Sequence, residues 1–295
     1  MKMSNKERIL NELGKMTEEE IELIGRTCQF VTDEDGEKML QFEAMLGLLI
    51  EKTDVAHFVG KYDEAPLHWL AAYSYTKIAE LLIENGADVH ALDMHGNTPL
   101  HKAAWYNNAP FANLLLANGA DVNASGDSLW TPLHEAARWG RPSMAKMLIK
   151  RGADVNAVGC VGNTPLHGVS SGGPDVASIL LANGAAVNAA DNDGETALMG
   201  VAKCGLAKPV KVASILLANG AAVNAVNNDG MTALMFAARY SVSDRVDIAS
   251  LLLTNGADVN VVNNKGETAL QMAVYSHGYT KIAALLRSKI SPAEG

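Results

Sequence analysis

Residues 93–104, DMHGNTPLHKAA, and residues 114–124, LLLANGADVNA, form a pair of motifs that recurs along the chain. The first motif returns as APLH, TPLH, TALM or TALQ, in copies that begin at Ala65, Thr98, Thr131, Thr164, Thr196, Thr232 and Thr268. The successive spacings are 33, 33, 33, 32, 36 and 36 residues, and the second motif follows each of the first six copies. A fixed period of this length indicates a repeat architecture, so we expect a stack of like units.

The residue types within each unit predict two short helices. Thr131 suits the N-cap of the first helix, where its hydroxyl can accept a hydrogen bond from an early N–H, and Pro132 suits the first helical position. The second helix, SMAKMLIK, has apolar residues at helical spacing and ends before Gly152, a residue type that favours a left-handed cap. One such pair cannot bury its apolar face alone, whereas stacked pairs can. The sequence therefore predicts an all-α solenoid of helix-turn-helix units.

These motifs resemble the ankyrin-repeat family, and the resemblance extends over about residues 60–290. It implies a stack of L-shaped units in which hairpin fingers project on one side. Inner helices would line a concave groove, and outer helices would form the back. The resemblance also implies that the chain recognises another protein, because most members of the family do so.

The spacing of the motifs predicts seven repeats, at about residues 59–91, 92–124, 125–157, 158–189, 190–225, 226–261 and 262–290, followed by a tail at 291–295. Residues 1–58 carry amphipathic segments that end in LLIEKTDVAHF, which aligns with LLIENGADVHA one repeat later. We therefore expect a helical N-terminal cap that includes a degenerate half repeat. Repeats five and six carry three extra residues between their helices, and both neutral drift and a functional role are open for these insertions.

The composition excludes some classes of function. The chain has 295 residues and a net charge of −9, which argues against a general nucleic-acid binder. Its three cysteines form no CxxC pair, which is typical of a reducing compartment. No secretory signal or apolar run of transmembrane length is present in the sequence, so a cytoplasmic location is expected. A protein exported by a signal-less secretion route would show the same features.

The histidines are the first candidates for chemistry, and their spacing argues against it. The same slot of four units holds His68, His101, His134 and His167. Equivalent slots of stacked units lie roughly 10 Å apart, whereas a metal site needs ligands at about 2 Å from the ion. We expect each imidazole to bond the neighbouring turn instead. No nucleophile elbow, HExxH motif or phosphate loop is present, so the sequence predicts no enzyme activity, metal or cofactor.

The candidate binding residues are the ones that break the repeating pattern. Large side chains concentrate at the ends of the inner helices and in the fingers, mainly in repeats one to three, beside core slots that hold small residues. Trp, Tyr and Arg dominate the energetics of protein interfaces. Trp69 is expected in the core, and some of the other rings could instead pack against neighbouring helices or residues 1–58. The predicted protein-binding residues, expected to form one patch in the groove, are Tyr73, Met94, His95, Trp105, Tyr106, Trp130, Arg138, Trp139, Lys203, Arg239, Tyr240 and Tyr275.

The sequence thus favours a monomeric, non-catalytic scaffold or adaptor that binds a helix, a loop or an extended peptide of another protein. An inhibitor or a secreted microbial effector that blocks or recruits its target through the same surface is the main alternative. An enzyme with a site in residues 1–58 and a purely structural spacer are two further alternatives. Residues 1–58 are poor in convergent polar residues, which argues against the enzyme. The aromatic residues at positions that vary between repeats argue against the spacer.

Overall fold

The computed structural model of the chain describes residues 61–72, 76–204, 208–239, 243–277 and 281–290. The chain divides into two compact units, Met1–Asp127 (unit 1) and Ser128–Gly295 (unit 2). The predicted N-terminal cap, the C-terminal tail and the predicted site residues Tyr73 and Tyr240 lie outside the described residues. Residues 205–207 and 240–242, which belong to the two insertions, also lie outside them.

Unit 1 contains two helix pairs in its described part. The first pair is α4 (Pro66–Leu70) and α5 (Thr76–Glu84), preceded by the 3-10 turn η2 (Lys61–Asp63), and the second is α6 (Pro99–Tyr106) and α7 (Ala109–Ala117). Helix α4 packs against α6, and α5 packs against α7. Leu67, Leu100 and Phe111 are completely buried in this unit. Like helices of successive repeats therefore bury one another's apolar faces, as the period predicts.

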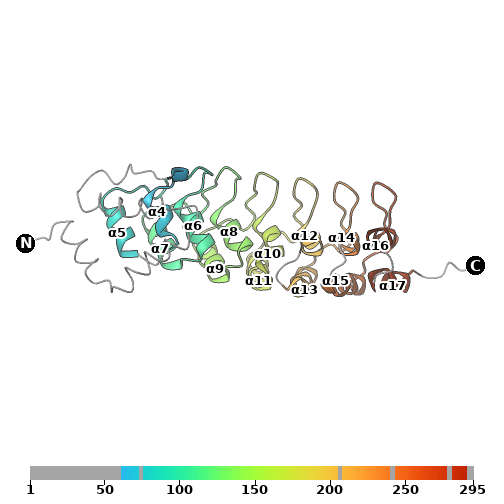
Figure 1. Cartoon of the computed structure of the whole chain (residues 1–295). Helices are drawn as coiled ribbons and strands as arrows, with labels where there is room; N and C mark the ends of the chain where they lie inside the picture. The colour runs from blue at the N-terminus through green and yellow to red at the C-terminus, as the bar shows by residue number, and fades with distance from the viewer. Residues whose placement is uncertain (1–60, 73–75, 205–207, 240–242, 278–280, 291–295) are drawn as a thin grey trace, which may run out of the picture. The chain divides into compact units, whose positions relative to one another are not determined.

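Unit 2 arranges its described helices in two layers (Figure 1). The inner layer consists of α8 (Pro132–Arg138), η3 (Pro165–Gly168) with α10 (Val169–Gly172), α12 (Ala197–Cys204), α14 (Ala233–Arg239) and α16 (Ala269–His277). The outer layer consists of α9 (Pro142–Lys150), α11 (Pro174–Ala182), α13 (Pro209–Ala218), α15 (Ser243–Thr254) and α17 (Lys281–Arg287). The finger loops project from the inner layer, on the side away from the outer helices. Unit 2 is therefore the predicted stack of helix pairs with projecting fingers.

Each finger is a tight turn that precedes an inner helix. In the finger before α14, the side-chain oxygen of Asn227 accepts hydrogen bonds from the backbone N–H groups of Asp229 and Met231, at 3.0 and 2.8 Å. Gly230 in this turn has a φ of 74°, a left-handed conformation that residues with a Cβ rarely adopt. The described residues form no strand, and only isolated antiparallel bridges close the bases of two fingers.

Neighbouring fingers of unit 2 are joined by a ladder of amide hydrogen bonds. The backbone N–H of Asn228 donates to the carbonyl oxygen of Asp193 at 2.9 Å, and its side-chain amide donates to the carbonyl oxygen of Asn192 at 2.9 Å. The side-chain amides of Asn192 and Asn264 bond the preceding finger in the same way. Each of these fingers is therefore held by the one before it in the chain.

The recurring histidines connect one repeat to the next repeat of the same unit. The Nδ1 atom of His68 accepts the backbone N–H of Ala65 at 3.0 Å, and its Nε2 atom lies 2.8 Å from the carbonyl oxygen of Asn97 in the next finger. Because Nδ1 accepts, Nε2 carries the hydrogen and donates it. His134 and His167 bond the next finger in the same way, at 3.2 and 3.1 Å. The predicted structural role of these histidines is confirmed.

The partner of the threonine that begins each motif differs between repeats. The hydroxyl of Thr98 lies 2.9 Å from Nδ1 of His101 rather than on an early helix N–H. Where methionine replaces the histidine, the predicted capping bond forms, as at Thr232, whose hydroxyl accepts the N–H of Met235 at 3.2 Å. The imidazole therefore substitutes for the helix N–H as the partner of the threonine hydroxyl.

Arg245 on α15 forms a contact that the sequence did not predict. Its guanidinium donates to the carbonyl oxygens of Val201, Ala202 and Lys203, at 3.0, 2.7 and 2.8 Å. These carbonyls belong to the last turn of α12, where a helix has no internal donors for them. The arginine is buried, and the partial negative charge at the carboxyl end of α12 compensates its positive charge.

We predict that replacing His68 with glutamine reduces the acid sensitivity of folding. Burial lowers the pKa of His68 below its ordinary value, although the Asn97 carbonyl and nearby carboxylates oppose this effect. The unfolded chain takes up a proton below pH about 6.5 that the folded unit resists, so wild-type stability falls on acidification. Thermal unfolding at pH about 7 and about 5 measures the loss in both proteins.

Glutamine is the matched replacement, because Gln271 fills the same slot in the last repeat and accepts the N–H of Thr268 at 2.7 Å. It keeps a hydrogen-bonding side chain in the slot but cannot titrate. An equal loss of melting temperature on acidification in wild-type and His68→Gln proteins would contradict the assigned cause.

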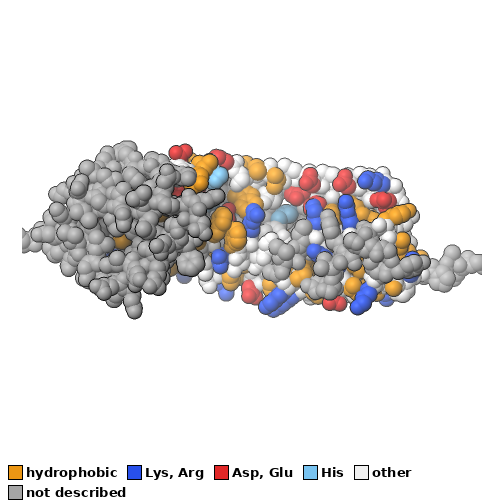
Figure 2. Space-filling model, in the orientation of Figure 1, with side chains coloured by type: hydrophobic (Ala, Val, Ile, Leu, Met, Phe, Trp, Pro, Cys, Tyr) orange, Lys and Arg blue, Asp and Glu red, His pale blue; other side chains and the backbone are white. Residues whose placement is uncertain are grey.

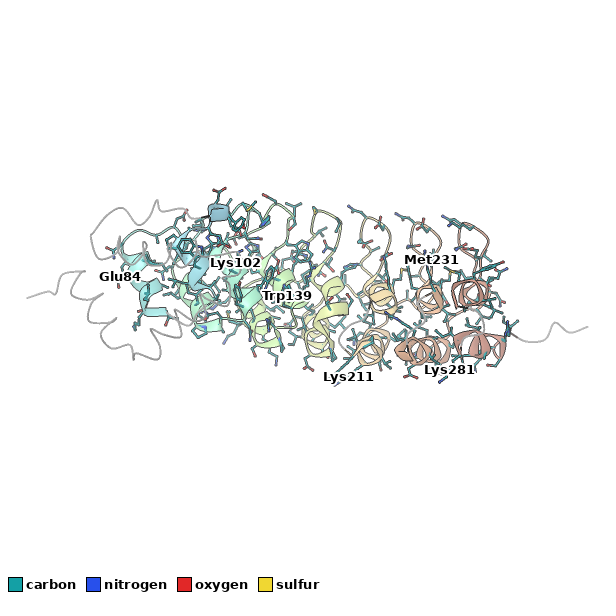
Figure 3. The ribbon with its side chains drawn as sticks, in the orientation of Figure 1. Glu84, Lys102, Trp139, Lys211, Met231 and Lys281 are labelled. Atoms are coloured by element: carbon teal, nitrogen blue, oxygen red, sulfur yellow. The ribbon has the colours of Figure 1, made fainter. Side chains whose placement is uncertain are left out.

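We predict that Arg245→Ala lowers the free energy of unfolding by about 2–3 kcal/mol, because three buried carbonyls lose a charged donor. Urea unfolding measures the change. Lys211→Ala is the control, because Lys211 is exposed on the outer helix α13 (Figure 3), and a change of under about 0.5 kcal/mol is expected there. Equal effects of the two substitutions would rule out this helix-capping role.

Candidate protein-binding surfaces

The predicted site residues within the described part of the chain are divided between the two units. We call Met94, His95, Trp105 and Tyr106 the unit 1 surface. We call Trp130, Arg138 and Trp139 the unit 2 surface, and Lys203, Arg239 and Tyr275 lie elsewhere in unit 2. The predicted continuity of one patch from repeat one to repeat three stays a prediction.

The unit 1 surface carries two neighbouring aromatic rings at the end of α6. The side chains of Trp105 and Tyr106 are 40% and 51% exposed, and their ring centroids lie 6.3 Å apart. Met94 and His95 are exposed in the finger that precedes this helix. Ala104, one residue before the rings, is completely buried. Along α6, the buried residues of the core therefore stop at Ala104, and the two aromatic residues that follow are exposed.

A buried ion network supports the finger of unit 1. The ammonium of Lys102, which Figure 3 labels, lies 3.0 Å from a carboxylate oxygen of Glu64 and 3.0 Å from one of Asp93. The other oxygen of Glu64 accepts the indole N–H of Trp69 at 2.8 Å. Trp69 is thus partly buried and bonded to a carboxylate, close to its predicted place in the core.

The charges of Asp93 and Lys102 persist at neutral pH. Burial by itself would raise the pKa of Asp93, but hydrogen bonds from Lys102 and from backbone N–H groups hold it below its ordinary value. Burial would likewise lower the pKa of Lys102, yet its bonds to Asp93 and Glu64 raise it. Asp93 also fixes the turn, because its other oxygen accepts the N–H groups of His95 and Asn97.

Three side chains of the unit 2 surface region form a stack. The indole of Trp130 lies 5.7 Å from the imidazole of His134, centroid to centroid, with only 17° between the ring planes. The guanidinium carbon of Arg138 lies 5.1 Å from the Trp130 ring, in cation–π contact. Trp130 is consequently only partly buried, whereas the sequence predicted an exposed ring. Arg138 itself is exposed.

Trp139 lies at the C-terminal end of α8 (Figure 3). Its side chain is 41% exposed, as predicted, and its indole N–H donates to a carboxylate oxygen of Glu135 at 3.0 Å. Glu135 is buried one turn earlier in the same helix. The ring is therefore oriented by the helix that carries it, with a large part of its apolar surface in solvent.

Gly159 makes room for the indole of Trp130. A Cβ atom at position 159 would lie 2.9 Å from Cδ1 of Trp130 and 2.3 Å from the side-chain oxygen of Asn163. Four other fingers hold a turn-forming carboxylate or amide in this slot, at Asp93, Asp191, Asn227 and Asn263. The side-chain oxygen of Asn163 is buried, and no hydrogen-bond donor reaches it. The indole thus takes the place of a side chain that fixes the turn elsewhere.

Leu129 occupies a backbone conformation that five other fingers give to glycine. Its φ is 55°, in the left-handed region, and its side chain is 50% exposed. The corresponding residues of other fingers are Gly96, Gly162, Gly194, Gly230 and Gly266. A residue with a Cβ loses about 1–2 kcal/mol in this conformation. The finger that carries Trp130 is therefore locally strained.

A hollow of about 200 Å³ opens in unit 2 beside the Trp130 stack. It lies between α8 and the η3–α10 segment, which replaces the single inner helix expected after Thr164. The segment lies very close to α8, since a Cβ at Gly168 would lie 3.0 Å from the backbone nitrogen of Arg138. The side chains that line the hollow include Trp130, His134, Arg138, Asn163, Ser170 and Ser171.

The remaining predicted residues of unit 2 have separate surroundings. Lys203 lies 2.8 Å from a carboxylate oxygen of Glu195 and 5.4 Å from the centroid of the Phe236 ring. Arg239 and Tyr275 line a second hollow of about 310 Å³, and Tyr275 is 78% exposed. Figure 2 shows Lys and Arg side chains spaced along the inner helices of unit 2, with Asp and Glu side chains in the fingers above them.

In the described part of the chain, no three histidine, cysteine or acidic side chains come close enough to hold a metal ion. None of the helices described is long and apolar enough to cross a membrane.

The sequence prediction overlooked Leu129 and Gly159. A signal for both was present, because aligning the fingers shows a leucine in a glycine slot and a glycine in an Asp or Asn slot. Their importance follows only from the backbone angle of Leu129 and the position of the Trp130 ring.

We predict that Leu129→Gly raises the free energy of unfolding by about 1 kcal/mol, because glycine adopts a positive φ without a steric penalty. Urea unfolding of the full chain measures the change. Gly266→Leu is the reciprocal control, since its φ is 75° and nothing lies within 4 Å of the added Cβ. This control should lose about as much stability as Leu129→Gly gains, and a Leu129→Gly protein that is less stable than wild type would exclude strain at this finger.

Comparisons with known proteins cover both units. Models described as "Ankyrin repeat", "Ankyrin repeats (many copies)" and "Ankyrin repeats (3 copies)" match residues 62–94, residues 82–136, and residues 133–225 and 201–293, respectively. The crystal structure of the human ASB11 ankyrin repeat domain is similar, with a TM-score of 0.69 and 28% sequence identity over 78% of this chain and 99% of that one. A search of curated proteins found no match. The family models and the stacked helix pairs show that the chain belongs to the ankyrin-repeat family. The repeats of this family serve in general as protein–protein interaction modules.

Proposed function

We propose that this chain is a non-catalytic scaffold or adaptor that binds a partner protein through the unit 1 and unit 2 surfaces. The observation that carries the proposal is the strained finger of the third repeat. There Leu129 adopts a left-handed conformation while its side chain is half exposed, and the Trp130 ring fills the space of the usual turn side chain of the next finger, at Gly159. Backbone strain of this kind concentrates at ligand-binding positions.

The energies favour binding over a structural role for this finger. The left-handed leucine of this finger costs about 1–2 kcal/mol, and the buried oxygen of Asn163 in the next finger, without a donor, costs about 1–3 kcal/mol. A whole domain is stable by only about 5–15 kcal/mol. Five other fingers place a glycine in the slot of Leu129, so the stack itself does not need this cost.

The unit 1 surface supports the same function by a different route. Trp105 and Tyr106 stand together outside a core whose neighbouring slots hold buried alanines. Such rings offer large contact areas, and their few rotatable bonds lose little entropy on binding. Met94 in the preceding finger is exposed as well, and exposed apolar side chains in one region mark contact sites when they gather into a patch.

The proposed partner segment is a helix, a loop or an extended peptide of another protein. Trp139 and Arg138 are the residue types that most often dominate binding energy, and both are exposed at the end of α8. An inhibitor or a secreted effector would use the same side chains, so the identity of the captured partner distinguishes these roles from that of an adaptor.

We predict that Trp105→Ala and Trp139→Ala each weaken partner capture about tenfold or more, because a hot-spot ring contributes about 2 kcal/mol. The measurement is affinity capture from a lysate, with the bound proteins quantified by mass spectrometry, followed by the affinity of the recovered partner for each variant. Each substitution tests the surface of its own unit.

Two controls separate binding from stability. Ile290→Ala removes an exposed apolar side chain that follows the outer helix α17, and it should leave capture unchanged. Trp139→Phe keeps an aromatic ring but loses the indole bond to Glu135, so it should keep more of the binding than Trp139→Ala. If both alanine variants retain the partner, or lose it only because they unfold, the proposed surfaces are wrong.

A further inference from the structure

The hollow beside Trp130 has a size that selects the kind of group that can enter it. Its volume is about 200 Å³. Sites for small molecules usually enclose about 300–1,000 Å³. The hollow is therefore suited to a single side chain presented by a larger partner rather than to a free small molecule.

The charge of the hollow is opposite to that of the chain. The chain as a whole carries 33 acidic and 24 basic side chains. Among the residues that line the hollow there is no Asp or Glu, and Arg138 supplies a full positive charge. This differs from the second hollow of unit 2, where Arg239 and Lys265 are balanced by Asp229 and Glu267.

Arg138 is held in position without being neutralised. Its guanidinium stacks on the Trp130 ring, and within the described part of the chain it forms no ion pair with a carboxylate. The nearby acidic groups are engaged otherwise, because Glu135 bonds the indole of Trp139 and Glu195 bonds Lys203. A guanidinium without a carboxylate partner keeps N–H groups available for the paired hydrogen bonds that match a carboxylate.

The opposite wall of the hollow adds small polar groups. Ser170 and Ser171 line it from α10, and Ser171 is exposed. The hydroxyl of Ser170 donates to the carbonyl oxygen of His167, whereas Ser171 has room to donate to an incoming oxygen. Gly168 carries no side chain that could fill the space between these serines and Arg138.

We infer that this hollow is a specificity pocket that receives an Asp or Glu side chain from an acidic segment of the partner protein, with Arg138 as its ligand. The inference rests on the proposed function and deepens it, because it assigns the charge of the partner segment. The carboxylate binds the edge of the Arg138 guanidinium, and Ser171 donates a hydrogen bond to it. Trp139 on the same helix end contacts the apolar part of the segment.

The test selects binders from a phage-displayed library of random short peptides on the full-length wild-type chain. The selected peptides should share an Asp or Glu position. Changing that residue to Gln or Asn should weaken binding to the wild type about tenfold or more, but less than about twofold to Arg138→Gln, because the charged contact is already absent there. The reversed-charge variant Arg138→Glu should select Lys or Arg at the same position.

A second pair of variants tests the pocket without changing Arg138. Ser171→Glu places a carboxylate beside the guanidinium and should block the acidic peptides, whereas the matched Ser171→Gln should bind them within about threefold of wild type. Both positions are exposed, so circular dichroism should show wild-type folding for all these variants.

The outcomes separate the inference from the proposed function. Peptides that carry no shared acidic position, or that bind Arg138→Gln as well as wild type, yet are lost with Trp139→Ala, overturn the acidic pocket and leave the binding surface standing. Peptides that bind wild type, Trp105→Ala and Trp139→Ala equally, or a library with no binder at all, overturn both.

Discussion

The structure depends on the contact of each helix pair with the next, which a histidine on three of the inner helices reinforces with a hydrogen bond to the next finger. A helix pair of this size cannot bury its own apolar side, so it is stable only when another pair covers it. The imidazole of His68 ties two repeats together, because Nδ1 holds its own turn while Nε2 reaches the carbonyl of Asn97. Burial lowers the pKa of this ring, which favours the neutral form that accepts at one nitrogen and donates at the other.

Much of this arrangement could be predicted from the sequence. The copies of the Thr-Pro-Leu-His motif give the helix starts, and Gly152 is a glycine of positive φ, as its place at a helix end predicts. The role of the histidines followed from their occurrence once in each of four units. These inferences succeed because the residues concerned bond either to their own turn or to the equivalent turn of the next repeat.

The features that could not be predicted depend on neighbours at irregular separations. Arg245 reaches carbonyls 42 to 44 residues earlier in the chain, and no periodic signal marks those partners. The exposure of Trp105 and Trp139 agrees with their pattern-breaking slots, but the stacking of Trp130 depends on the missing side chain of Gly159. Likewise, the inner helix after Thr164 is split into η3 and α10, and this segment lies close to α8 at Gly168 and Gly172, where an added Cβ would meet the backbone of Arg138 and Ala137. Local propensity does not report such close approaches.

The direction of the amide ladder between the fingers bears on how the protein is made. Asn192, Asn228 and Asn264 each donate backwards, to a carbonyl that precedes them in the chain. During synthesis the amino-terminal part of a chain emerges and folds first. The fingers that carry Asn192, Asn228 and Asn264 therefore emerge when the acceptors of their side-chain amides are already in place, so these bonds can close in the order of synthesis.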